Sequence, residues 1–152
     1  MEFTKKITES TEEIFNTMIF LDVAAEAPLE EKVQIEGCHV SAMIGLTGSF
    51  SAMMSIHCPE AVSLAVTGAM LGMELSEIDA DVKDALGEIA NMVAGGIKER
   101  FIAEDIKLEL AIPTAITGKS YIISSPTRSN RIVIPFSVEQ GQFFVEIKYN
   151  LN

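Results

Sequence analysis

Two short segments of alternating hydrophobicity, separated by a glycine turn, constrain the fold of this chain most. In residues 40–46, and again in residues 50–56, apolar side chains alternate with small or polar ones. Such alternation is typical of strands that bury one face. Residues 47–49 between them, centred on Gly48, predict the turn of a β-hairpin. The apolar face of this hairpin has to be covered, and helical segments on either side of it can supply that cover.

Three segments outside the hairpin have the periodicity of helices. The first runs from about residue 4 to residue 20, and residues 10–13 match a capping box within it. The second occupies residues 59–72, where a proline suits the first turn and a glycine ends the helix. The third and longest begins at residue 79 or 81 and extends to about residue 102. We expect these helices to be amphipathic and to pack on the sheet.

The rest of the chain is predicted as loops and further strands. A loop is expected over residues 24–31, turns over 118–119 and 139–141, and a polar loop over 126–130. Strands are expected in the intervening segments, residues 106–117, 121–124, 132–138 and 142–149. The order of helix, hairpin, two helices and then strands predicts an α/β (α+β) fold with a mainly antiparallel sheet. The length of 152 residues suits a single domain, residues 1–152.

The charge of the chain argues against several classes of partner. There are 22 acidic and 11 basic residues, which give a formal net charge of −11. A nucleic acid or an anionic membrane would repel such a surface. Residues 37–59 carry no formal charge, but they contain several serines, histidines and glycines and do not read as a membrane span. The N-terminal residues lack the apolar core of a signal peptide, so a cytoplasmic location is expected.

The histidines and cysteines near the predicted hairpin were considered as metal ligands. A turn centred on Gly48 places His39 opposite His57 and Cys38 opposite Cys58. Two histidines alone make a weak site, and the cysteines would point to the other face of the sheet. We therefore expect no metal site. The two cysteines are expected to be buried thiols in a reducing compartment, with a cross-strand disulfide as the alternative under oxidation.

The third predicted helix carries two stripes of opposite character. At about 100° per residue, one stripe is apolar and must face the core. Its members are Val82, Leu86, Ile89, Val93 and Ile97. The second stripe, called here the polar stripe, lies on the opposite side of the helix. It consists of Asp84, Glu88, Asn91, Gly95 and Lys98.

Glu88 and Asn91 are neighbours on the polar stripe, since they are three residues apart. Every amphipathic helix has a polar side, so the pair alone is weak evidence for a site. Asparagine and glycine are, however, poor helix formers on an exposed surface. Gly95 and Gly96 permit two interpretations: a flat surface that another protein approaches, or close packing of Gly96 against a neighbouring element of the chain.

The pattern Asp84-x-x-x-Glu88-x-x-Asn91, followed 22 positions later by Pro113, resembles the motif of the CheC/CheX/FliY chemotaxis phosphatases. The length and the single motif copy are similar to the CheX-like members of that family. A second Glu-x-x-Asn, formed by Glu13 and Asn16, has no proline at the expected distance and is not counted as a site.

This resemblance implies a phosphatase that hydrolyses the aspartyl phosphate of a CheY-like response regulator. The partner would hold Mg²⁺ and supply a lysine, so the chain itself would need no cofactor. Asn91 would position the attacking water and Glu88 would pair with the partner's lysine. Docking would use Asp84, Gly95 and Lys98, with Pro113 supporting the motif.

The same resemblance implies a homodimer, and it leaves other functions open. One is a non-catalytic module that binds a response regulator or belongs to a flagellar switch. Another is self-association through the strands that follow residue 106, which is compatible with either activity.

Overall fold

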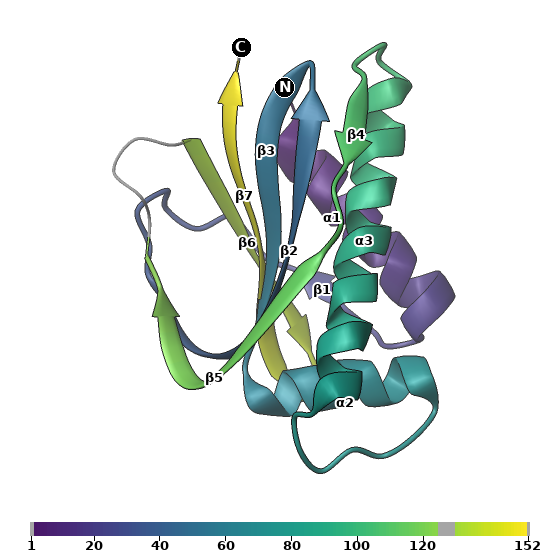
Figure 1. Cartoon of the computed structure of the whole chain (residues 1–152), viewed down its shortest axis with the longest axis vertical. Coiled ribbons are helices and arrows are strands. Elements are labelled where there is room, and N and C mark those ends of the chain that lie inside the picture. Colours follow the sequence, from purple (N-terminus) through teal and green to yellow (C-terminus); the bar gives the residue numbers. More distant parts are fainter. Residues whose placement is uncertain (1, 125–129, 152) are drawn as a thin grey trace.

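The computed structural model describes residues 2–124 and 130–151 of the chain (Figure 1). The described part of the chain contains three α-helices, a short π-helix called η1 that follows the first of them, and seven strands. Their order is α1 (Phe3–Ile14), η1 (Phe15–Ile19), β1 (Ala24–Ala25), β2 (Ile35–Gly48), β3 (Phe50–Cys58), α2 (Glu60–Leu71), α3 (Ala80–Ile102), β4 (Leu108–Leu110), β5 (Thr114–Ile123), β6 (Asn130–Val138) and β7 (Gly141–Leu151).

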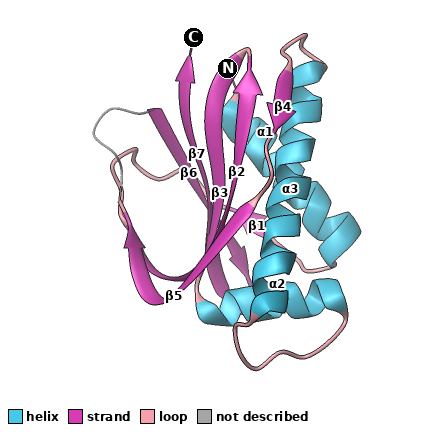
Figure 2. Cartoon of the chain, in the orientation of Figure 1, coloured by secondary structure: helices cyan, strands magenta, loops and turns pink. Residues whose placement is uncertain are grey.

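The strands form one seven-stranded sheet in the order β1-β6-β7-β3-β2-β4. The pairings between the described strands are antiparallel. Strand β5 also pairs with β2, because β2 is long enough to pair with β4 near one end and with β5 near the other. Helices α1 and α3 lie beside the sheet, and α2 crosses one end of it (Figures 1 and 2). The predicted α+β architecture is confirmed.

The apolar stripe of α3 forms the centre of the core. Its five side chains are each at most 1 % exposed. Burial of one large aliphatic side chain contributes roughly 1.5–3 kcal/mol, so this stripe strongly favours docking of α3 on the sheet. The helix begins where predicted, because the Asp79 carboxylate accepts a hydrogen bond from the Val82 N–H at 3.2 Å. Helix α2 also ends as predicted, at Gly72 in the left-handed region.

The predicted hairpin exists, but its register differs by two residues. Val40 pairs with Cys58, and Ser41 pairs with His57, so the predicted Cys38–Cys58 and His39–His57 pairs are wrong. The turn is centred on Ser49 because β2 continues through Gly48 to pair with β4. Within the paired residues 40–46 and 52–58, a shift of two residues leaves each side chain on its predicted face of the sheet. Cys38 is the exception, because the register of β2 against β5 shifts between Cys38 and Val40, and Cys38 packs with Val133 instead of with Val40.

The capping box predicted at residues 10–13 is wrong. Helix α1 already begins at Phe3, because Phe3 and Ile7 are both buried and hold the first turn against the core. Ser10 is therefore inside the helix and fully buried, and its hydroxyl donates to the Val93 carbonyl of α3 at 2.7 Å. The end of this region, close to the predicted residue 20, is the π-helix η1.

Two further predictions on the strands are corrected. The turn predicted at residues 118–119 lies inside β5, whose register against β2 shifts twice. The strand predicted over residues 106–117 is interrupted at 111–113, where the chain passes from β4 to β5. Long strand β2 keeps both segments in the sheet, which local turn signals do not anticipate.

The two predicted loops have different outcomes. The loop expected over residues 24–31 contains the two-residue strand β1, which pairs with β6. Of the predicted loop 126–130, residues 126–129 lie outside the described part of the structure, and Asn130 already begins β6.

Candidate functional site

The polar stripe of α3 lies on the solvent side of the helix. Asp84 and Glu88 are exposed, whereas Asn91, Gly95 and Lys98 are partly exposed. The backbone beneath them is rigid because the opposite side of the same helix is completely buried. The helix therefore presents these groups in a defined arrangement without using a mobile loop.

Glu88 and Asn91 lie side by side on the solvent side of α3. Among residues 2–124 and 130–151, neither side chain takes part in a hydrogen bond or ion pair. They lie one turn apart, so a carboxylate and a carboxamide are presented side by side. Two unpaired polar groups with an inward-facing apolar stripe behind them are available to a second molecule.

Gly95 and Gly96 have different environments, which answers the question raised by the sequence. A Cβ at Gly96 would overlap the Ser10 hydroxyl oxygen and lie 3.1 Å from the Ser10 Cβ. Apart from its chain neighbours and the backbone of its own helix turns, no described atom lies within 4 Å of a Cβ placed at Gly95. Gly96 therefore permits close packing of α1 on α3, whereas Gly95 leaves the surface of the polar stripe flat.

Pro113 lies against the side of α3 next to the polar stripe. A Cβ at Gly87 would be 4.0 Å from the Pro113 Cβ. Gly87 directly precedes Glu88 and is one turn before Asn91, so Pro113 borders both. The connection between β4 and β5 thus forms one edge of the surface that the polar stripe presents.

Lys98, at the C-terminal end of the polar stripe, has a charged neighbour on strand β4. Its Nζ lies 4.0 Å from an oxygen of Glu109, whose side chain is 86 % exposed. Such an exposed pair contributes little to stability. Lys98 can therefore exchange Glu109 for an acidic group of a partner at small cost.

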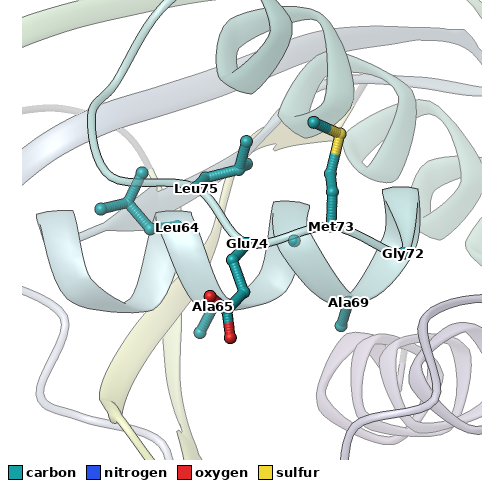
Figure 3. A pocket seen from close by; sticks show the side chains of 8 residues that line it. Leu64, Ala65, Ala69, Gly72, Met73, Glu74 and Leu75 are labelled. Carbon is teal, nitrogen blue, oxygen red and sulfur yellow. The ribbon is translucent and has the colours of Figure 1, made fainter.

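One hollow on the described surface lies away from the polar stripe. It has a volume of about 620 Å³ and lies between α2 and the segment that follows it (Figure 3). Most of the side chains that line it are aliphatic or methionine, and Glu74 is the one charged residue among Leu64, Ala65, Gly68, Ala69, Gly72, Met73, Glu74 and Leu75. It holds no paired nucleophile and base, so it offers no catalytic chemistry.

A buried polar network crosses the sheet, and it is not predicted from the sequence. Its members come from five neighbouring strands, β5, β2, β3, β7 and β6: Tyr121, Ser41, His57, Glu146 and Arg131. The Ser41 hydroxyl is 2.6 Å from the Tyr121 oxygen and 2.7 Å from the His57 Nδ1. The order Ser–His–Glu has the composition of a hydrolase triad, but Ser41 is fully buried and no substrate can reach it.

The carboxylate of Glu146 is held ionised by its neighbours in the buried polar network. One carboxylate oxygen lies 2.9 Å from the His57 Nε2, and the other accepts a hydrogen bond from Arg131. Burial acts to raise the pKa of Glu146, but the hydrogen bonds from His57 and Arg131, together with their charges, outweigh burial and lower it. Arg131 also donates to the main-chain carbonyl oxygens of Glu31 and Val33. The network therefore ties the segment before β2 to the sheet.

Two further features concern metal binding and membrane insertion within the described residues. No group of three or more His, Cys, Asp or Glu side chains there is arranged to hold a metal ion. No described helix is both long and apolar enough to cross a membrane.

Comparison with solved structures identifies the class of protein. The crystal structure of the chemotaxis protein CheX from Desulfovibrio desulfuricans is 30 % identical, and the match covers 99 % of this chain and 100 % of that one, with a TM-score of 0.88. This chain therefore has the fold of a chemotaxis protein CheX, and its Glu-x-x-Asn lies on the solvent side of the long helix α3. Residues 40–137 match the family model "Chemotaxis phosphatase CheX". The chain belongs to the CheX family of chemotaxis phosphatases.

Two further relatives bear on function. The CheY-P phosphatase CheX of Thermotoga maritima is 29 % identical over 84 residues, which are 55 % of this chain and about half, 54 %, of that relative. A CheX–CheY–BeF₃–Mg²⁺ complex from Borrelia burgdorferi contains a similar fold, with a TM-score of 0.83, 20 % identity and coverage of 97 % of each chain.

Proposed function

We propose that this chain hydrolyses the aspartyl phosphate of a CheY-like response regulator, using the polar stripe of α3. The observation that carries the proposal is the Glu88–Asn91 pair on the solvent side of a rigid helix, where neither side chain has a hydrogen bond or ion pair within the described part of the chain. Membership of the CheX family supports it. So do the two relatives, one called a CheY-P phosphatase and the other crystallised with CheY, BeF₃ and Mg²⁺.

Asn91 is assigned the positioning of the attacking water. In the reaction, the water oxygen bonds to phosphorus while the bond from phosphorus to the aspartyl oxygen breaks, releasing inorganic phosphate and a free carboxylate. Phosphoryl transfer requires the attacking and leaving oxygens to be in line. A carboxamide is neutral and both donates and accepts hydrogen bonds, so Asn91 can hold the water without repelling the phosphoryl group. Its buried neighbours on α3 keep it in position.

Glu88 is assigned to the partner's lysine. A charge-assisted hydrogen bond between them would set the register in which α3 enters the partner's site. The partner holds the Mg²⁺ that neutralises phosphoryl charge, and the chain contributes no cofactor of its own. Asp84, Gly95 and Lys98 complete the contact, two as charged groups and one by leaving room for the partner's backbone.

Pro113 is assigned a supporting role. It lies beside α3 at Gly87, next to the backbone from which Glu88 and Asn91 project. Because a proline ring restricts its own backbone, the connection between β4 and β5 forms a stiff border beside Asn91. Pro113 therefore supports the position of the motif without touching the phosphoryl group.

The assembly and location of the protein follow from the same proposal. We place it in the cytoplasm, with its substrate, and propose a homodimer formed through sheet edges. Strand β5 pairs only with β2 among the described strands, so its other edge offers main-chain donors and acceptors to a second copy. Light scattering on a gel-filtration peak tests this, and a monomer mass at high protein concentration would exclude it.

The phosphatase proposal is tested by the decay of a labelled regulator. A CheY-type response regulator is phosphorylated with ³²P, and loss of label is followed with and without the chain. The proposal predicts faster loss with catalytic amounts of the chain. Unchanged decay with measurable binding would identify a non-catalytic docking module, and unchanged decay without binding would remove both functions.

A further inference from the structure

Ile112 is the most exposed of the large hydrophobic side chains in the described structure, at 87 %. Single apolar residues on a protein surface are common and need no explanation by themselves. Ile112 differs from the others in its place beside the polar stripe, and its backbone is held on both sides; the two properties together indicate an interface residue.

The backbone on both sides of Ile112 is held in place. On one side the Ala111 N–H donates to the Gly45 carbonyl oxygen of β2 at 2.9 Å. On the other side Pro113 packs beside Gly87 of α3, and Thr114 begins β5 opposite Met43. The connection therefore presents Ile112 in one arrangement. Little conformational entropy remains to be lost when its side chain is buried by a partner.

The position of Ile112 joins it to the polar stripe. Pro113 lies beside α3 at Gly87, immediately before Glu88, and Ile112 is the residue before that proline. Interfaces commonly combine a few buried apolar side chains, which supply much of the affinity, with polar groups that set orientation. The polar stripe has orienting groups, but it contains no large apolar side chain. Ile112 is the neighbouring residue that can provide one.

We propose that Ile112 is the apolar anchor of the surface that docks the response regulator. This inference rests on the function proposed above. The occupant is a receiver surface with a cation opposite Glu88 and an apolar recess beside that cation. Charge complementarity favours it, because Asp84 and Glu88 are both unpaired within the described residues and attract a cationic site. The carboxylates orient the encounter, and burial of Ile112 slows dissociation.

The test compares two substitutions of the same residue type. Ile112→Ala removes the anchor, and Ile122→Ala removes an isoleucine that is 56 % exposed near the far end of β5. Binding to CheY carrying beryllofluoride and Mg²⁺ is measured by titration calorimetry, and dissociation by stopped flow. Both variants should melt at nearly the same temperature as the unsubstituted chain, since neither side chain is in the core.

The proposal predicts that Ile112→Ala raises Kd about tenfold, mainly through faster dissociation. The dephosphorylation rate at saturation should stay within about twofold, because Ile112 does not touch the phosphoryl group. Ile122→Ala should change Kd less than about twofold.

Equal Kd values for the two variants, or a loss of saturating rate without a change in Kd, would overturn the assignment of Ile112. In either case the proposed function stands if the unsubstituted chain still accelerates dephosphorylation and Asn91→Ala does not. If the unsubstituted chain neither binds nor dephosphorylates the regulator, both the function and the anchor are refuted.

Discussion

Gly96 of α3 lies directly against Ser10 of α1, and the Ser10 hydroxyl donates to the carbonyl one turn earlier on α3 at 2.7 Å. No side chain fits at residue 96 without displacing that hydroxyl. At Gly95, the preceding residue, the space is open. Two adjacent glycines thus have separate purposes, one in the packing of two helices and one on the exposed surface.

Alanine substitutions should separate these two purposes. Gly96→Ala is expected to destabilise the protein by about 1–3 kcal/mol, because Ser10 has to move away from its buried acceptor. Gly95→Ala is expected to be neutral or to stabilise by up to about 1 kcal/mol, since alanine favours the helix. Urea unfolding measures both values. Equal destabilisation by the two substitutions would contradict the packing described for Gly96.

The buried carboxylate of Glu146 should make stability depend on acid pH. Its pKa is lowered in the folded protein from an ordinary value of 4.5, so the ionised form contributes stability above that pH. The contribution is lost as the pH falls from about 4.5 through the lowered folded-state pKa. Free energies of unfolding at pH 3 to 7 measure this loss, and Glu146→Gln should show a weaker dependence over the same range.

The same substitution should be costly at neutral pH. Glu146→Gln leaves the guanidinium of Arg131 buried without its carboxylate, which typically costs about 3–5 kcal/mol. Glu109→Gln is the matched control, since that side chain is 86 % exposed and should change stability by less than about 0.5 kcal/mol. Equal effects of the two substitutions would show that the network is not a buried ion pair.

The two cysteines should be unreactive in the folded protein. Both are free and buried, and burial, with a smaller effect of Glu146, raises the pKa of Cys38 to about 11. Burial also raises the pKa of Cys58. Only the thiolate is nucleophilic, so Ellman's reagent at pH 8 should modify the native protein slowly and both thiols rapidly in denaturant. Rapid modification before unfolding would contradict the burial of these side chains.

Helix α3 could be predicted from the sequence because its signals are local. A sustained apolar stripe, a capping aspartate and the Glu88–Asn91 spacing all lie within one element. The proximity of Pro113 and Gly87 depends on how β4 and β5 pair with a distant strand. Periodicity carries no information about that contact, so the border of the site and the position of Ile112 emerge only from the fold.

The errors at the hairpin and at α1 have the same physical origin. Local patterns predicted a turn at Gly48 and a cap at Ser10, but each residue is used in a long-range contact. Gly48 pairs with Leu108 of β4, and Ser10 bonds to α3. The buried polar network is a further example, because its five members come from separate strands and share no spacing that a sequence pattern would reveal.

In the proposed function, Asn91 acts on the reaction and not on complex formation. The variant Asn91→Ala has a matched control in Asn16→Ala, which removes an exposed helical asparagine from the other Glu-x-x-Asn of the chain. For each, Kd for beryllofluoride-loaded CheY is measured beside the single-turnover dephosphorylation rate at saturation.

Asn91→Ala should lower the saturating rate about 100-fold or more while Kd changes by less than about threefold. Asn16→Ala should leave both quantities unchanged. The contradicting result is the opposite division, in which Asn91→Ala abolishes binding while turnover in the surviving complex keeps its original rate.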